Sequence, residues 1–157
     1  MTNAQRDTST DLSAVQRLSL RFAGVFENPH SAKDVFSSDV FFDLNMPVWR
    51  MQLQGPEAFA AQLEQINEGD VRIEVLRTVP TATGFVTEHE EHQLVGGQDL
   101  TARRLWLCEM KNGRIIEAVG YCSGEWDADL RARHAAEAPM IRLEERAVPD
   151  LLTGGLS

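Results

Sequence analysis

A change of hydrophobic period near residue 70 constrains the fold of this chain more than any other feature. Before that point apolar residues recur at helical spacing, as in Leu18 and Phe22, which predicts helices. After it they alternate, as in Val71, Ile73 and Val75, and a period of two predicts strands. Helices followed by a run of strands predict an α+β domain, with a curved antiparallel sheet packed against the N-terminal helices.

We expect one domain between a short leader and a tail. Gly-Gly at 96–97 and Asn-Gly at 112–113 favour hairpins between the later strands. Proline is poorly tolerated inside a helix but suits its first position, so Asn28-Pro29 and Gly55-Pro56 separate the early helices. The predicted boundaries are a flexible leader at 1–10, helices at 11–27, 31–38, 56–69 and 125–138, strands at 39–47, 71–79, 83–95, 100–110 and 114–123, a further extended piece at 48–55, a domain at 11–138 and a tail at 139–157.

The final predicted hairpin leaves the facing of its last strand open. A two-residue Asn112-Gly113 turn pairs Arg104 with Tyr121 on one face of the sheet. A three-residue Lys111–Gly113 loop with a bulge pairs Arg104 with Gly120 and sends Tyr121 to the other face. A slip of one residue reverses every side chain beyond it, so the turn decides which face Tyr121 occupies.

The composition argues against several classes of partner. The 157 residues carry a formal net charge of −9, with 43% hydrophobic and 25% charged residues. The hydrophobic and charged fractions are typical of globular domains. The net negative charge disfavours nucleic acid as a partner. No apolar run approaches the roughly 20 residues that span a bilayer, and the first residues lack the apolar core of a signal peptide. The two cysteines are expected as free thiols, which favours a reduced, cytoplasmic protein without membrane contact.

The segment Thr87–Gln93, TEHEEHQ, concentrates the chemically active residues of the chain. Its flanks, Phe85-Val86 before and a Gly-Gly turn after, favour a strand, on which His89 and His92 point to opposite faces. This argues against a shared metal ion, and the spacing differs from the His-Glu-x-x-His zinc motif. His89 and Glu91 share a face, so the carboxylate can raise the pKa of the imidazole and orient it for acid–base chemistry. The alternative is a solvated ladder of salt bridges.

Several stretches together resemble the nuclear transport factor 2-like superfamily, specifically its SnoaL-like and limonene epoxide hydrolase-like members. They are FFDLNMP at 41–47, QGPEAFAAQL at 54–63 and KNGRIIEAVGYCSGEWD at 111–127, after a helical first third. The resemblance covers about residues 11–127. It implies a cone-shaped α+β fold whose sheet and helices surround one deep, mostly apolar pocket, into which His89 and Glu91 point.

Limonene epoxide hydrolases carry a Tyr-x-Asn-x-Pro stretch and an Arg-x-Asp pair, and the resemblance maps both onto this chain. Asp43 takes the position of the Tyr and Asn45 that of the Asn, the groups that hold the attacking water. His89 takes the position of the Arg, and Glu91 that of the acid that protonates the epoxide oxygen. The Asp that deprotonates the water falls on Gly120, so the family's route is incomplete unless Asp43 supplies that carboxylate.

The resemblance also places Ala102, Arg104 and Trp106 on the pocket side of the next strand. Arg104 is expected either to stabilise developing negative charge or only to neutralise Glu91 in a buried ion pair. Trp106 and Trp49 are expected to wall the pocket or simply to pack.

The leading hypothesis is a cofactor-independent acid–base enzyme, of the epoxide hydrolase, polyketide cyclase or isomerase type, acting on a small, largely apolar oxygenated molecule. The alternatives are a non-catalytic module that binds a small molecule in the same pocket, and a scaffold that pairs through its sheet. The family also implies a homodimer formed through the sheet, and neither a metal nor a cofactor is expected. The candidate catalytic residues are His89, Glu91 and Asp43, and the candidate substrate-binding residues are Asn45, Trp49, Arg104 and Trp106.

Overall fold

The computed structural model describes residues 11–67, 70–138 and 140–142. The predicted leader at 1–10 and most of the predicted tail at 139–157 lie outside these ranges. The described elements are, in order, α1 (Leu12–Glu27), the 3-10 helix η1 (Pro29–Ser31), α2 (Ala32–Val35), β1 (Phe36–Asn45), β2 (Arg50–Gln54), α3 (Pro56–Ile66), β3 (Val71–Pro80), β4 (Gly84–Val95), β5 (Gln98–Lys111), β6 (Arg114–Cys122) and α4 (Ala128–Glu137).

The strands of the described chain form one six-stranded sheet in the order β2-β1-β6-β5-β4-β3. All neighbouring strands are antiparallel except β1 and β6, which run parallel. The sheet is therefore mixed, and the prediction of a wholly antiparallel sheet is wrong at this one pair. The reason is topological, because β1 and β6 are joined through α3 and several strands, and this long connection lets the chain return in the same direction.

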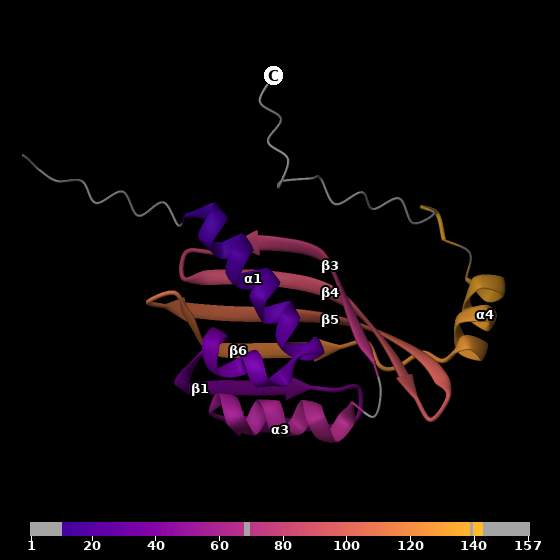
Figure 1. Cartoon of the computed structure of the whole chain (residues 1–157). Coiled ribbons are helices and arrows are strands. Elements are labelled where there is room, and N and C mark those ends of the chain that lie inside the picture. The colour runs from indigo at the N-terminus through magenta and orange to yellow at the C-terminus, as the bar shows by residue number, and fades with distance from the viewer. Residues whose placement is uncertain (1–10, 68–69, 139, 143–157) are drawn as a thin grey trace, which may run out of the picture.

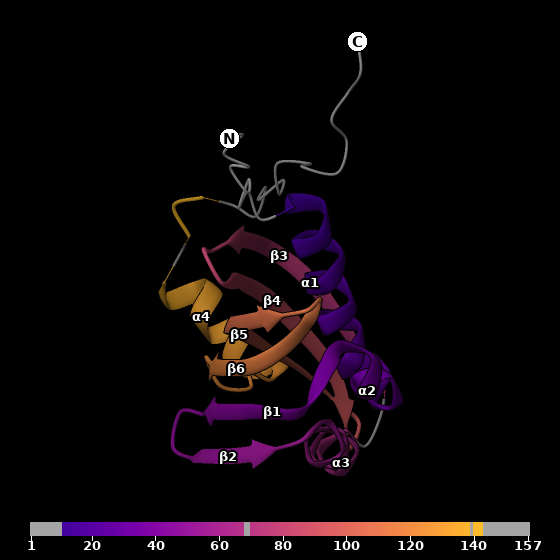
Figure 2. The ribbon, with the colours of Figure 1, turned by 90° about the vertical axis from the view of Figure 1, so that its left-hand side faces the viewer.

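Helices α1, α2 and α3 lie on one side of the sheet, which we call the inner side, and α4 lies on the other, outer side (Figure 2). Helix α1 crosses the inner face of the strands (Figure 1). It begins where the sequence predicts, because the Asp11 carboxylate accepts a hydrogen bond from the Ser13 backbone N–H at 3.1 Å. The space between the helices and the sheet is filled by a cluster of aromatic side chains, which are Phe22, Phe26, Phe36, Phe42, Phe59, Phe85 and Trp106.

The second predicted helix is shorter than expected. It ends at Val35, and β1 begins at Phe36, where the expectation placed a helix to residue 38. Phe36 is buried among the core aromatics and pairs with Ile115 of β6, so tertiary packing overrides the local helical pattern at this point. The third helix also stops early, at Ile66.

The β5–β6 hairpin follows neither of the two registers considered above. Asn112 and Gly113 both have positive φ, 53° and 74°, and they form a two-residue turn between Lys111 and Arg114. A bulge then shifts the pairing on the β6 side, so that Arg104 lies opposite Cys122. Because of this shift, the side chains of β6 face the same way as expected for the three-residue loop with a bulge. Tyr121 points outward, where it is half exposed.

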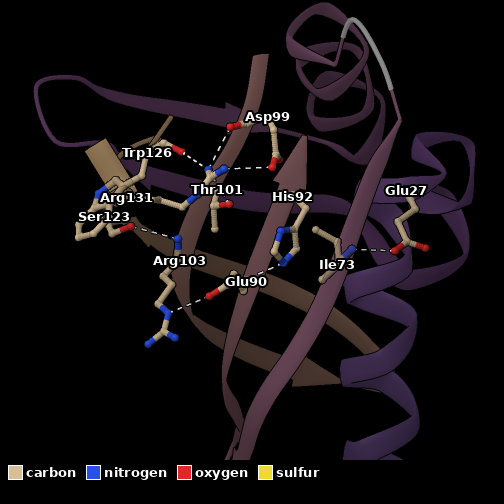
Figure 3. A network of polar contacts seen from close by, with 10 residues as sticks. All are labelled: Glu27, Ile73, Glu90, His92, Asp99, Thr101, Arg103, Ser123, Trp126 and Arg131. Carbon is tan, nitrogen blue, oxygen red and sulfur yellow. Dashed lines mark hydrogen bonds and ion pairs between the residues drawn. The ribbon is translucent and has the colours of Figure 1, made fainter. Parts of the chain in front are cut away.

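Helix α4 is held to the outer side of β5 mainly by one arginine (Figure 3). Arg131 donates from Nη1 to the backbone carbonyl of Trp126 at 2.7 Å and to that of Asp99 at 3.0 Å. Its Nη2 lies 3.0 Å from an Asp99 carboxylate oxygen. Backbone hydrogen bonds between Thr101 and Trp126 complete the attachment, so α4 leaves the inner face of the sheet untouched.

Candidate functional site

A row of polar side chains lies on the inner face of β4, under the aromatic cluster. Thr87, His89, Glu91 and Gln93 are all buried, which confirms that the predicted strand turns this set of alternate residues inward. Charged residues of the same strand, including Glu90, point to the outer face and pair there with arginines of β3 and β5. The inner row is therefore a polar strip inside an otherwise apolar interior, and such a strip requires an explanation.

Glu91 is part of a buried ion pair. Its Oε2 accepts from Nε of Arg104 at 2.5 Å, and the two side chains are 2% and 10% exposed. The amide nitrogen of Gln93 donates to the other carboxylate oxygen. Burial opposes the charge of Arg104, but the adjacent Glu91 carboxylate raises the pKa of the guanidinium above its ordinary value. The ion pair considered as the alternative role of Arg104 is thus formed.

His89 is fully buried and is not paired with Glu91. Its ring lies against Phe26, with centroids 4.9 Å apart, and is stacked on Phe22 at 6.4 Å. Burial, and then the positive charge of Arg104, lower the pKa of the imidazole to about 3. The prediction that Glu91 orients His89 and raises its pKa is therefore wrong, and His89 is a neutral imidazole near pH 7.

Three side chains of the inner face have buried polar atoms without a hydrogen-bond partner among the described residues. These atoms are Nδ1 and Nε2 of His89, Oε1 of Gln93 and Nε1 of Trp106. His89 and Gln93 come from β4, and Trp106 comes from the neighbouring β5. An unpaired buried polar group costs about 1–3 kcal/mol, so three such side chains on one face are an unusual concentration.

Thr87, the fourth polar residue of the row, has hydrogen-bond partners for its hydroxyl group. The Thr87 hydroxyl lies 3.2 Å from the hydroxyls of both Ser19 and Thr78, and donates to the backbone carbonyl of Arg77 at 3.2 Å. Ser19 and Thr78 are themselves 2.7 Å apart. This cluster joins α1, β3 and β4 and has a structural role, so the unpaired atoms are confined to the part of the row beyond Thr87.

Asp43 and Asn45 lie on the outer face and do not join this group. In β1 the apolar Phe42 and Leu44 point inward, and the register pairs Asp43 with Val119 and Gln52 of the outer face. Nε and Nη2 of Arg50 donate to the Asp43 carboxylate at 2.8 and 2.5 Å, and these hydrogen bonds hold its pKa below the ordinary value.

Asn45 donates to the backbone carbonyl of Gly120 at 3.3 Å. The expectation that Asp43 joins His89 in one pocket is therefore wrong. Asn45 lines a small cavity with Arg104 and Trp106, but His89 is not part of that lining. The period of two in β1 turns Phe42 and Leu44 inward and therefore Asp43 and Asn45 outward, against the placement that the motif resemblance implies.

The two tryptophans expected at the pocket differ in their surroundings. Trp49 lies in the loop between β1 and β2 and is 67% exposed, so it does not wall the inner site. Trp106 is buried and packs against Phe22 and Phe26. The predicted inward facing of Trp106, Arg104 and Ala102 on β5 is confirmed by their pairing with the inner row of β4.

Trp106 also explains the glycine at position 120. The two residues lie opposite each other in the β5–β6 register. A Cβ atom on residue 120 would come within 2.6–2.8 Å of three carbons of the indole ring. The indole therefore occupies the volume that an acidic side chain at this position would need, and the carboxylate of the family's epoxide hydrolases has no room here.

Replacing Gly120 with alanine should lower the free energy of unfolding by about 1–3 kcal/mol, as overpacked cores do. Trp106→Leu in the same chain should relieve the clash, so the double variant should be less destabilised than the sum of the single variants. Urea denaturation of the four proteins measures this coupling. Additive effects would show that Trp106 does not press on position 120.

A small cavity opens where β1 and β6 end, beside the middle of β5. Asn45, Met46, Arg104, Trp106 and Cys122 contribute to its lining, and its volume is about 10 Å³. This is room for roughly one water molecule. Arg104 Nη1 lies 3.8 Å from the sulfur of Met46, so Met46 covers the buried ion pair at this end of the sheet. No sequence motif marks Met46 or Cys122 as part of the site.

No group of three or more His, Cys, Asp or Glu side chains in the described ranges is arranged to hold a metal ion. Neither Cys108 nor Cys122 is bonded to another cysteine, as the sequence predicts. Burial raises the pKa of the Cys108 thiol. Within the part of the chain that the structure covers, no helix combines the length and apolar character needed to cross a membrane.

No protein-family model matches the chain, and no curated protein does. Solved structures do match it. An LEH-like epoxide hydrolase of M. tuberculosis is 14% identical, with 71% of this chain and 84% of that chain covered and a TM-score of 0.58. An NTF2-like protein of unknown function from Mesorhizobium loti is 19% identical, with 71% and 93% covered and a TM-score of 0.55.

A third similar structure is a hypothetical protein with a ketosteroid isomerase-like fold from Catenulispora acidiphila, in complex with trimethylamine. It is 12% identical, with 66% of this chain and 83% of that chain covered and a TM-score of 0.58. The chain thus has the nuclear transport factor 2-like fold, as the sequence resemblance implies. Likeness at this level of identity concerns the fold alone, and function has to be argued from the site.

Proposed function

We propose that this chain binds a small, largely apolar molecule carrying a hydroxyl or carbonyl group on the inner face of its sheet. The observation that carries the proposal is the set of unpaired polar atoms on His89, Gln93 and Trp106. Buried polar groups in folded proteins are nearly always paired, and a ligand that hydrogen-bonds to these atoms removes their desolvation cost. The surrounding phenylalanine rings supply the apolar surface that ligand sites usually have.

Binding requires the site to open beyond its present volume. The aromatic rings over His89 come from α1. The small cavity at Met46 and Cys122 is lined by Trp106, whose ring centroid lies 6.4 Å from that of His89. A ligand that enters at this end displaces Met46 and shifts Phe22 and Phe26 away from the sheet. Sites of this kind are minor conformations that a ligand makes dominant.

2-Naphthol is a suitable probe because it is an apolar aromatic molecule with one hydroxyl group. We expect saturable binding by isothermal titration calorimetry. His89→Phe keeps an aromatic ring but removes both nitrogens, and should weaken binding by roughly three- to tenfold, the value of one neutral hydrogen bond. His92→Phe makes the same change on the outer face of β4 and should leave the affinity unchanged. Equal losses in both variants, or no binding to the unchanged protein, would count against the inner site.

A second candidate function is the acid–base enzyme expected from the sequence. It is favoured by one observation, that a buried carboxylate, Glu91, shares the inner face with the neutral imidazole of His89. The similar structures include an epoxide hydrolase. As an epoxide hydrolase, the protein would separate Glu91 from Arg104, and Glu91 would take up a proton and donate it to the epoxide oxygen. Water would attack the epoxide carbon, and the imidazole of His89 would accept the proton that the water loses. Hydrolysis of styrene oxide that Glu91→Gln abolishes, without loss of styrene oxide affinity, would support the enzyme over the binding module.

We also propose that the chain forms a homodimer through the outer face of its sheet. Leu105, Leu107 and Tyr121 are 41–51% exposed there, on adjacent strands, and apolar patches of this kind often mark interfaces. Leu107→Arg should convert the dimer to a monomer, because it would bury an unpaired charge at the two-fold contact. Sedimentation equilibrium measures the mass. The exposed Leu20→Arg on α1 is the control and should leave the dimer intact.

A further inference from the structure

The charge balance of the inner site determines which ligand it accepts. We infer that the site selects an uncharged ligand over an anionic one, and that Glu91 sets this selectivity by neutralising Arg104. The inference rests on the proposed binding function and deepens it, because it names the charge class of the ligand. It also assigns Glu91 a role in specificity that does not require it to transfer a proton.

The cation of the inner face is already paired with a carboxylate. The Arg104 guanidinium and the Glu91 carboxylate are in direct contact at 2.5 Å, and both side chains are at least nine-tenths buried. The inner-face neighbours that pack around them are neutral. They are the His89 imidazole, the Gln93 amide, the Trp106 indole and the phenyl rings of α1. The Glu125 carboxylate makes a smaller contribution that also raises the pKa of Arg104. A ligand therefore meets a site whose one buried cation is already balanced by carboxylates.

The atoms left unpaired are themselves neutral donors and acceptors. Neutral His89 offers one N–H donor and one nitrogen acceptor, Trp106 offers an N–H donor, and Gln93 offers a carbonyl acceptor. Together they suit a hydroxyl group, which donates and accepts, or a carbonyl oxygen, which accepts. None of these atoms compensates a full charge, so the hydrogen-bonding pattern and the charge balance favour the same class of ligand.

An anionic ligand is disfavoured because its binding leaves a buried carboxylate without a cation. To contact Arg104, its carboxylate has to displace the Glu91 carboxylate, which then remains buried without a cation. If it binds without displacing Glu91, the ligand carboxylate itself is buried without a cation. Both outcomes place one uncompensated negative charge in the interior, which is strongly unfavourable.

The test uses 2-naphthol and 2-naphthoate, which share a ring system and differ in charge at pH 7. Isothermal titration calorimetry with the unchanged protein should give an affinity for 2-naphthol that exceeds that for 2-naphthoate by about tenfold or more. Glu91→Gln keeps the shape of the side chain and an oxygen acceptor for Arg104 but removes the negative charge. It should invert the preference, because the freed guanidinium can then pair with the carboxylate of 2-naphthoate.

The matched control is Glu90→Gln on the same strand, whose side chain pairs with Arg103 on the outer face (Figure 3). It should leave the ratio of the two affinities unchanged. Circular dichroism first establishes that each variant is folded, and the ratio measured on the unchanged protein stands without any variant. Equal affinities, or tighter 2-naphthoate binding, in the unchanged protein would overturn the inference while leaving the binding function in place. Failure of both probes to bind overturns the binding function and the inference with it.

Discussion

Replacing Arg104 with methionine should lower the free energy of unfolding by about 3–5 kcal/mol, the cost of leaving one partner of a buried ion pair alone. The Glu91 carboxylate is 2% exposed, so water does not replace the lost guanidinium. Urea denaturation at pH 7 measures the effect. The effect is large because the two charges are stable in the interior only together.

Two further variants identify the cause of this loss. Glu91→Leu combined with Arg104→Met removes both charges, and should recover most of the stability, since apolar replacements of buried pairs are often neutral or stabilising. Arg103→Met is the matched control on the outer face, where the arginine side chain is 41% exposed and pairs with Glu90. It should cost less than about 1 kcal/mol. A double variant as unstable as Arg104→Met would show that Arg104 acts through packing and not through charge.

The second large effect is acid lability that arises from His89. The pKa of this imidazole is about 3 in the folded protein, against an ordinary value of 6.5. In the unfolded chain the imidazole gains a proton below pH 6.5, while in the folded protein it stays neutral down to about pH 3. Its contribution to stability is therefore complete above pH 6.5 and is lost as the pH falls toward 3, at about 1.4 kcal/mol per pH unit.

Between pH 6 and pH 4 this loss amounts to about 2.5 kcal/mol. Carboxylates that titrate in the same range contribute as well, so the comparison is with His89→Phe, which cannot gain a proton. The unchanged protein should lose about 2.5 kcal/mol more than the variant over this interval, measured by urea denaturation at each pH. Parallel pH profiles for the two proteins would mean that His89 is solvated and not buried among Phe22, Phe26 and Trp106.

The architecture could be predicted from the sequence because its signals are local and strong. The period of two in β4 predicts correctly that His89 and Glu91 share the inner face, and the Asn112-Gly113 pair predicts a turn. The bulge in β6 beyond that turn has no such signal, because no glycine marks it. The pairing of Arg104 with Cys122 therefore depends on tertiary packing. The outward facing of Tyr121 is the one expected from the bulged three-residue loop.

The chemistry of the site was harder to predict because it depends on residues distant in sequence. His89 and Glu91 are two residues apart, which suggests that they pair. The Arg104 guanidinium on the neighbouring strand instead pairs with the Glu91 carboxylate, because it carries a full positive charge and the imidazole does not. The burial that keeps His89 neutral comes from Phe22 and Phe26 of α1. Neither effect appears in the TEHEEHQ segment itself.

The most direct test of ligand binding at the inner face is the tryptophan indole N–H spectrum of ¹⁵N-labelled protein during titration with 2-naphthol. The chain has 3 tryptophans, and Trp106 is the buried one beside His89, with an indole nitrogen that has no partner among the described residues. Its resonance, identified with a Trp106→Phe variant, should move downfield as the N–H gains an acceptor, while Trp49 and Trp126 stay in place. A Trp106 resonance that does not move at saturating 2-naphthol would contradict a binding site on the inner face.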